Sequence, residues 1–149
     1  MTVRVQEADF DLAAEIAALT HGRDAGAVVT FTGLVRAGEG AGRITAMTLE
    51  HYPGMTESAL RQVEVEANRR WPLAASLVVH RYGRLVPGDN IVLVVTVSAH
   101  RQAAFEAANF LMDYLKTEAP FWKREERASG ETVWVEAKAS DDAARERWE

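Results

Sequence analysis

Strand-like segments occur in consecutive pairs along this 149-residue chain, and helix-like segments separate the pairs. Consecutive strands joined by short connections pair antiparallel, whereas parallel neighbours need a long crossover connection. The pattern therefore predicts an α+β fold with a mainly antiparallel sheet and packed helices. The expected strands cover residues 3–6, 27–35, 44–52, 76–82, 91–99, 121–127 and 132–138, and the expected helices cover 11–20, 55–70, 101–117 and a short tail at 141–149.

The two long helices each carry an apolar stripe at helical spacing, which should face the core. The glycine-rich loop at 36–43 is linker-like, but it comes too early in the chain to separate two self-sufficient cores. We therefore expect one domain that spans residues 1–149. The stripe of the first helix consists of Met55, Ala59, Val63 and Ala67, and that of the second consists of Ala104, Phe105, Ala108, Leu111, Met112 and Leu115.

Residue types that are missing or sparse exclude several classes of function. Without cysteine the chain has no disulfide, no thiolate metal ligand and no thiol nucleophile. The four histidines form neither an HxH nor an HExxH pair, and no phosphate-loop or dinucleotide motif is present, so neither a metal nor a cofactor is expected. A net charge of −5 disfavours binding to nucleic acid. The longest apolar run, 91–95, is too short to cross a bilayer, and the polar N-terminus is unlike a signal peptide, so we expect a cytoplasmic protein.

Lysine is scarce, with three residues against fourteen arginines, and two of the three lysines bracket Pro120. Lys116 lies at the edge of the apolar face of its helix. It is either a snorkelling side chain at the helix C-terminus or a partly desolvated amine that can act as nucleophile or base. Lys123 shares a strand face with Phe121 and Glu125. It is either a plain surface charge or, with Lys116, part of a site for one anionic ligand.

Further cationic residues stand at the ends of expected elements. His100 and Arg101 begin the helix that Lys116 ends, a position that attracts anions but that suits solvated charges equally well. Arg36 ends a strand just before the glycine-rich loop, and Lys138 ends the last expected strand. His100 and Lys116 are sixteen residues apart on one helix, or about 24 Å, so one chain cannot easily bring both to one small ligand. Either there are two sites, or one site is shared between two copies of the chain.

His80 and Arg81 are a second adjacent cationic pair, on the expected strand at 76–82. Neighbouring residues of a strand point to opposite faces of the sheet. At least one of the two is therefore expected to have a structural role.

Six segments make the sequence similar to a known family. They are FTGLVR (31–36), MTLEHYPGM (47–55), HRYGRLVPGD (80–89), SAHRQAAFEA (98–107), MDYLKTEAPFWKRE (112–125) and WVEAK (134–138), which together span most of the chain. Each segment is weak alone, but the fourth and fifth with their spacing are highly specific. The sequence resembles the MoaE family, the large catalytic subunits of molybdopterin synthase.

The resemblance implies an α/β-hammerhead fold and a homodimer, with a small ubiquitin-like subunit (the MoaD type) docked at each end to give a heterotetramer. It also implies a sulfurtransferase of molybdenum cofactor biosynthesis. The C-terminal thiocarboxylate of the small subunit would supply two sulfurs to cyclic pyranopterin monophosphate and form the dithiolene of molybdopterin. Such an enzyme needs no thiol of its own, which agrees with the absence of cysteine.

The functional residues of the family carry over to matching positions of this chain. In the family two lysines are essential, and residues from both large subunits form the substrate pocket. One position departs from the family, because Lys138 stands where relatives often carry arginine, and lysine lacks the bidentate fork of a guanidinium. The implied catalytic residues are Lys116 and Lys123, and the implied substrate-binding residues are Arg36, His100, Arg101, Lys138, Phe31 and Met112, of which His100 and Arg101 come from the second subunit.

Two other classes of function remain open from the sequence. A non-catalytic scaffold would hold a ubiquitin-like partner and would not bind a pterin phosphate. An unrelated anion-binding enzyme, acting on a phosphorylated metabolite, would be active without a partner protein. The presence of both lysines and of the pair His100 and Arg101 favours the synthase.

Overall fold

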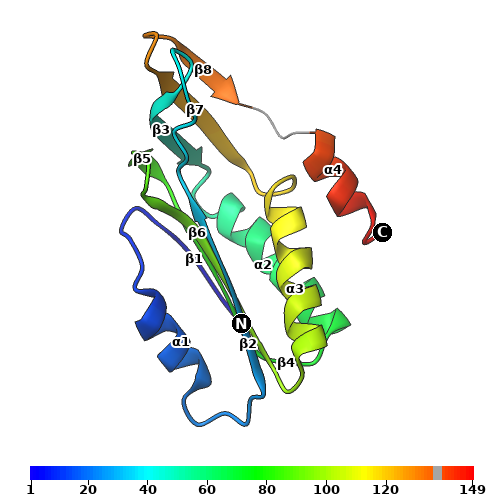
Figure 1. The fold of residues 1–149 in the computed structure, drawn as a ribbon. Coiled ribbons are helices and arrows are strands. Elements are labelled where there is room, and N and C mark those ends of the chain that lie inside the picture. The colour runs from blue at the N-terminus through cyan, green and yellow to red at the C-terminus, as the bar shows by residue number, and fades with distance from the viewer. Residues whose placement is uncertain (136–138) are drawn as a thin grey trace.

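Two four-stranded sheets and four helices make up the described part of the chain, residues 1–135 and 139–149 of the computed structural model (Figure 1). The first sheet has the strand order β1-β4-β6-β2, and the second has the order β5-β3-β7-β8. Among the described strands, β1 and β4 pair in parallel and all other neighbours are antiparallel, which confirms the predicted class. The strands are β1 (Thr2–Gln6), β2 (Ala27–Leu34), β3 (Ile44–His51), β4 (Leu73–Arg81), β5 (Gly83–Leu85), β6 (Asn90–Ser98), β7 (Phe121–Arg127) and β8 (Thr132–Val135), and the helices are α1 (Leu12–Thr20), α2 (Met55–Arg70), α3 (Arg101–Leu115) and α4 (Ala139–Glu146).

The first sheet carries the main core, because helices cover both of its faces. Figure 1 shows α2 and α3 on one face and α1 on the other. Side chains alternate along β6, so that Val92 and Val94 join the cluster with α2 and α3, whereas Leu93 and Val95 join the cluster on the α1 side. The central strands are therefore buried on both faces, and α3 is held on a rigid platform.

The second sheet has one packed face and one exposed face. Leu49 of β3 and Leu85 of β5 are buried in a small cluster with Val35. Lys123 of β7 lies opposite Leu49 in the register of β3 and β7, so it shares the inner face, whereas Trp122 points outward and is exposed. The predicted hairpin of the last two strands is confirmed by the antiparallel pairing of β7 with β8.

The predicted apolar stripe of α2 is confirmed at Ala67, which is fully buried, and at Val63, which packs against the core, but not at its first residue. The buried side chains are Thr56, Leu60, Glu64 and Ala67, while Met55 is 62% exposed. The reason lies in the first turn, where the Thr56 hydroxyl accepts a hydrogen bond from the N–H of Tyr52 and donates one to the carbonyl of Pro120. These two bonds turn Thr56 inward and Met55 outward.

The stripe of α3 is confirmed except at Phe105, which is 56% exposed. In the half of α3 that contains Phe105, the buried residues are alanines, which allow the helix to approach β2 and β6 closely. Met112 is half-buried and packs against the core, as predicted. The buried residues of α3 are Ala103, Ala104, Ala107, Ala108, Phe110, Leu111 and Leu115.

Several boundaries differ from the prediction. β4 begins at Leu73, three residues earlier than expected, and β5 was not predicted because three residues carry too little pattern. The end of the predicted last strand, 136–138, lies outside the described residues. No helix in the described ranges is long and apolar enough to cross a membrane.

Candidate active site

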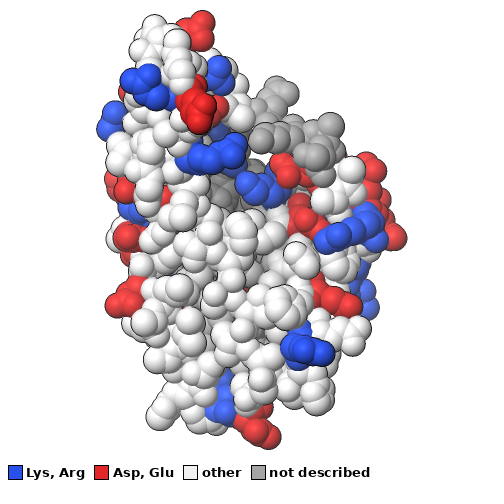
Figure 2. All heavy atoms as spheres, viewed as in Figure 1, with Lys and Arg blue, Asp and Glu red and all other residues white. Residues whose placement is uncertain are grey.

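The turn between α3 and β7 carries two of the three lysines. Lys116 is the residue after the last turn of α3, where its N–H bonds the carbonyl oxygen of Met112 at 3.1 Å, and its side chain is exposed. An exposed amine at the helix C-terminus agrees with the first of the two interpretations given for this residue. Lys123 is half-buried on the inner face of β7. In Figure 2, Lys and Arg side chains gather where the second sheet meets the C-terminal end of α3.

Buried contacts from other elements fix this turn at two points. The Thr56 hydroxyl, at the start of α2, donates a 3.2 Å hydrogen bond to the carbonyl of Pro120, and Thr56 is fully buried. Phe121, the next residue, stacks on the ring of His80 with the ring centroids 3.7 Å apart and the planes 18° apart. The backbone between the two lysines is thus held by α2 on one side and by β4 on the other.

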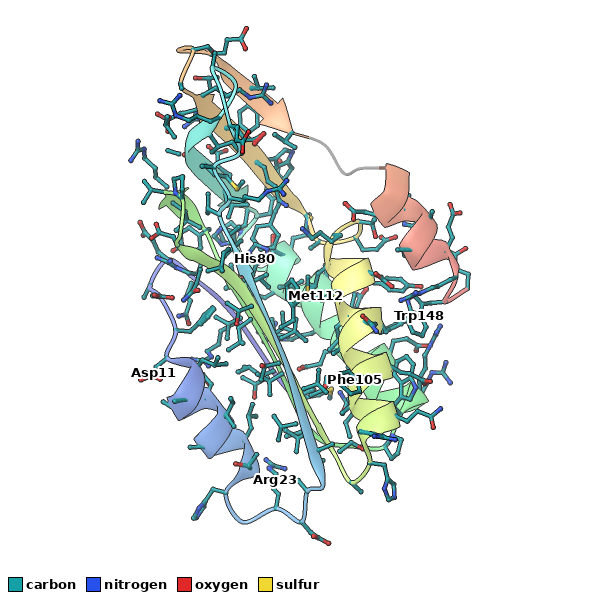
Figure 3. All side chains as sticks on the ribbon, in the orientation of Figure 1. Asp11, Arg23, His80, Phe105, Met112 and Trp148 are labelled. Atoms are coloured by element: carbon teal, nitrogen blue, oxygen red, sulfur yellow. The ribbon has the colours of Figure 1, made fainter. Side chains whose placement is uncertain are left out.

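His80, which is labelled in Figure 3, is a buried residue on which the charges of both lysines act. Burial lowers the pKa of His80 to about 4, and the positive charges of Lys123 and Lys116 act in the same direction. A charge affects a neighbour's pKa in this way only over a short distance, so both lysines lie near this ring. Both lysines are therefore close enough to His80 to act on its charge state.

A second histidine extends the cluster. The His51 ring lies 4.4 Å from the Tyr82 ring and 6.4 Å from that of Phe121, measured between centroids. Its Nε2 atom lies 3.7 Å from a carboxylate oxygen of Glu57, at the start of α2. Aromatic and polar contacts therefore continue from His80 across the junction of the two sheets.

The predicted cations at the other end of α3 do not meet the lysines within one chain. His100 and Arg101 are exposed at the N-terminal end of the helix, and Lys116 follows its C-terminal end. Sixteen residues of helical rise separate His100 from Lys116 by about 24 Å.

The remaining predicted residues are dispersed. Arg36 is exposed beyond the end of β2, and Phe31 is 40% exposed on that strand. Met112 lies one turn before Lys116 on α3. Lys138 lies outside the described residues.

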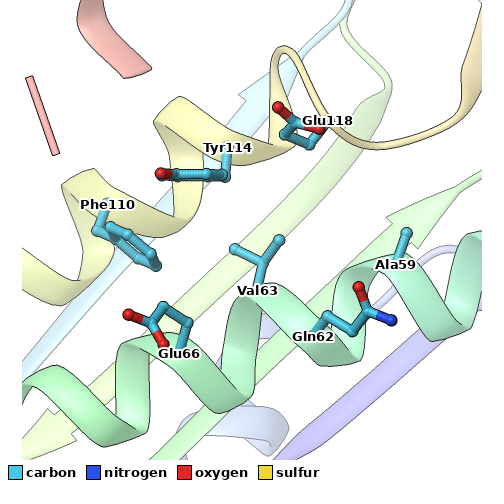
Figure 4. Close-up of a pocket in the computed structure, with 7 residues that line it drawn as sticks. All are labelled: Ala59, Gln62, Val63, Glu66, Phe110, Tyr114 and Glu118. Atoms are coloured by element: carbon cyan, nitrogen blue, oxygen red, sulfur yellow. The ribbon is translucent and has the colours of Figure 1, made fainter. Parts of the chain in front are cut away.

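The groove between α2 and α3 is a different kind of site (Figure 4). It has a volume of about 260 Å³, and its floor is formed by Val63 and Phe110. Glu66 and Glu118 stand at its rim, and hydrogen bonds from Arg69 and Arg70 lower the pKa of Glu66 to about 2. Carboxylates at the rim make the groove unsuitable for a phosphate. In the described ranges, no three His, Cys, Asp or Glu side chains are grouped to hold a metal ion.

Sequence reasoning missed the roles of Thr56 and His51, and it gave His80 no more than a structural expectation. A signal for His80 was present, because a single histidine follows the apolar run Leu77–Val79 of a buried strand. Nothing in the pattern pointed to Thr56, since its partner Pro120 is 64 residues away.

Comparisons with known proteins bear on the whole chain. The family profile described as the MoaE protein matches residues 5–118. A protein of Mesorhizobium japonicum named molybdopterin synthase catalytic subunit is 62% identical over 149 residues, which cover 99% of this chain and 92% of that protein. The solved molybdopterin biosynthesis MoaE protein from Burkholderia ambifaria MC40-6 has 53% identity and a TM-score of 0.83, over 99% of this chain and 97% of that one. The crystal structure of molybdopterin synthase from Staphylococcus aureus has 30% identity and a TM-score of 0.81, over 89% and 95%.

The matches agree in family along nearly the full length of the chain and in the arrangement of its elements. From its profile match and its relatives, this chain belongs to the MoaE family, the catalytic subunits of molybdopterin synthase.

Proposed function

We propose that this chain transfers sulfur to cyclic pyranopterin monophosphate from a small ubiquitin-like partner with a C-terminal thiocarboxylate. The observation that carries the proposal is the fixed turn that holds Lys116 and Lys123 beside His80. Two ammonium groups at one place suit an anionic substrate and an anionic sulfur donor. The chain itself has no cysteine, so the sulfur must arrive on another molecule.

The reaction is an exchange of oxygen for sulfur. The thiocarboxylate sulfur attacks a side-chain carbon of the pyranopterin, forming a carbon–sulfur bond while an oxygen substituent of that carbon leaves. Water then cleaves the acyl–sulfur bond, so that sulfur stays on the substrate and the partner leaves with an ordinary carboxylate. No oxidant or reductant is consumed. Two such exchanges, each with a fresh thiocarboxylate, produce the dithiolene.

The two lysines take different roles in this proposal. Lys123, half-buried on the inner face of β7, binds the substrate and stabilises the negative charge that develops as the oxygen leaves. Lys116, exposed at the end of α3, positions the thiocarboxylate and serves in proton transfer. Met112, one turn earlier on α3, lines the same space.

A second copy of the chain completes the substrate site. His100 and Arg101 cannot reach the lysines of their own chain, so in this proposal they serve the lysines of the other copy and, with Arg36, neutralise the cyclic phosphate. Support comes from the edge strand β2, where Phe31 and Leu34 are 40% and 56% exposed. Exposed apolar side chains on an edge strand favour association with another chain.

The remaining parts of the proposal follow from the family. The chain acts as one domain, in the cytoplasm, as a homodimer with one small subunit at each end. Lys138 adds a further positive charge for the phosphate. A glycine-ended tail of the small subunit would enter the space between the lysines, because glycine is narrow enough to pass between packed side chains.

The test is conversion of cyclic pyranopterin monophosphate in a purified mixture of this chain and a thiocarboxylated small subunit. We expect dithiolene to form, and to form only when both proteins are present. A small subunit ending in an ordinary carboxylate is the matched control and should give no product. Absence of dithiolene from the complete mixture would contradict the proposal, and turnover without the partner would favour the unrelated anion-binding enzyme.

A further inference from the structure

His80 joins the two sheets through a ring contact close to the turn that carries the lysines. It lies near the end of β4 in the first sheet and is 6% exposed. Its ring stacks on Phe121, the first residue of β7 in the second sheet, at 3.7 Å between centroids. Because β4 lies within the buried core, its end is a fixed reference point for the start of β7.

The ring is uncharged at neutral pH. Its Nδ1 atom lies 2.8 Å from the carbonyl oxygen of Arg81, and a carbonyl can only accept, so Nδ1 carries the hydrogen. Burial lowers the pKa of His80 to about 4, and Lys123, Lys116 and His51 act in the same direction. A flat, uncharged ring can therefore sit beside two ammonium groups without repelling them.

Phe121 links this ring to the lysines. It is two residues before Lys123 and on the same face of β7, and it directly follows Pro120, whose carbonyl is bound by Thr56. Removing the His80 ring would leave a cavity under Phe121 and free the start of β7 to shift. Displacements of about 1 Å in a reacting group can lower a rate about a hundredfold.

We propose that His80 is a positioning residue for sulfur transfer: stacked on Phe121, it sets the position of Lys123 relative to Lys116. The proposal rests on the function proposed above for those lysines. It concerns the flat ring itself and needs neither a proton transfer nor a charge at His80. A phenyl ring should therefore replace the imidazole, although the carbonyl of Arg81 then loses its partner.

The experiment compares His80→Ala and His80→Phe with wild type at a temperature at which circular dichroism shows all three folded. We expect His80→Ala to lower kcat at least about tenfold, with the KM for the pterin and the affinity for the small subunit within about twofold of wild type. His80→Phe should keep kcat within about threefold of wild type, even if its melting temperature falls. His21→Ala, at an exposed histidine after α1, is the matched control and should change nothing.

A second readout does not depend on turnover. Trace acetylation followed by mass spectrometry reports the reactivity of Lys116 and Lys123 in each variant. We expect their relative reactivity to change at least about threefold in His80→Ala and to stay at the wild-type value in His80→Phe. If wild type forms no dithiolene, the proposed function fails while the labelling still decides the role of His80.

Two results would overturn the inference. One is a kcat and a labelling ratio in His80→Ala within about twofold of wild type. The other is a loss of activity that follows the unfolded fraction equally in both variants, because His80 would then only contribute to stability.

Discussion

The two ends of α3 differ in how far a single chain completes them. At the C-terminal end, a buried hydroxyl and a buried ring fix the turn between Lys116 and Lys123. At the N-terminal end, His100 and Arg101 are exposed, and the described part of the chain shows no side-chain capping bond at His100. The C-terminal end is fixed by buried contacts within one chain, whereas at the N-terminal end His100 and Arg101 face solvent.

This difference agrees with a division of labour between two copies. Groups that take part in bond making must be placed accurately, which burial within one chain achieves. Groups that neutralise a phosphate act over a longer range and tolerate assembly from a second chain. The comparison therefore predicts that changes at the C-terminal end affect rate most strongly, and that changes at the N-terminal end are felt by the other copy.

The largest effect on turnover is expected at the C-terminal end of α3. Lys116→Ala and Lys123→Ala should each lower turnover about a hundredfold or more, because each removes a charge that the transition state needs. Association with the small subunit, measured by isothermal titration calorimetry, should be retained. Arg124→Ala is the matched control, since Arg124 neighbours Lys123 but points to the outer face of β7. Near-normal turnover in Lys116→Ala would remove that residue from the mechanism.

The buried ring at the same end should make stability depend on pH. The pKa of His80 is about 4 when folded, against an ordinary value near 6.5, so the unfolded chain binds the proton more readily. The stabilisation is complete above pH 6.5 and is lost as the pH falls toward 4, a change of about 3 kcal/mol in the free energy of unfolding.

Comparing wild type with His80→Phe isolates this contribution, because burial raises the pKa of Glu64 and gives the opposite trend in both proteins. Urea unfolding at several pH values measures it. The free-energy difference between the two proteins should shift in favour of His80→Phe as the pH is lowered from 7 to 4. A difference that stays constant with pH would mean that His80 is not buried as a neutral ring.

Elements with strong local patterns were predictable from the sequence. The range 121–127 of β7 follows from the hairpin signal at Ser129 and Gly130, and the start of α3 at Arg101 follows from helical spacing. Lys116 and Lys123 also stand out, because lysine is scarce and both flank a proline. What failed was the burial of two single positions: Met55 and Phe105 are apolar and correctly spaced, yet both are exposed.

The missing information is tertiary. Thr56 faces inward because of Pro120, 64 residues away, and no local pattern encodes that contact. His80 matters because Phe121, from another sheet, stacks on it. Both contacts join segments that are distant in sequence. Local sequence patterns therefore point to the lysines but not to the residues that fix the turn between them.

A smaller effect is expected at the N-terminal end of α3. Mixing two variants tests whether one site is shared between two chains. Arg101→Ala should lower turnover about tenfold by weakening phosphate binding. When Lys116→Ala and Arg101→Ala chains are mixed and allowed to exchange, half of the dimers are mixed and each has one intact site, so about a quarter of wild-type activity should return.

The control for the mixing experiment is a pair of variants from the same end. Lys116→Ala mixed with Lys123→Ala leaves no site with both lysines, so no activity should return. Recovery only in the first mixture would establish that one site uses both ends of α3 from different chains. Failure of both mixtures to recover, with exchange shown by tagged subunits, would mean that each chain works alone.

The smallest effect is expected at Phe105, one turn beyond Arg101 in the N-terminal half of α3. Phe105 is 56% exposed, so Phe105→Ala should leave the folded monomer as stable as wild type. If this half of the helix faces a second copy, losing the ring should raise the dimer dissociation constant about tenfold, as measured by analytical ultracentrifugation. Val65→Ala, at a residue 52% exposed on α2, is matched in exposure and should not change the dimer. If Phe105→Ala and Val65→Ala have equal dimer dissociation constants, the second copy does not contact this half of α3. His100 and Arg101 would then not serve a site shared between two copies.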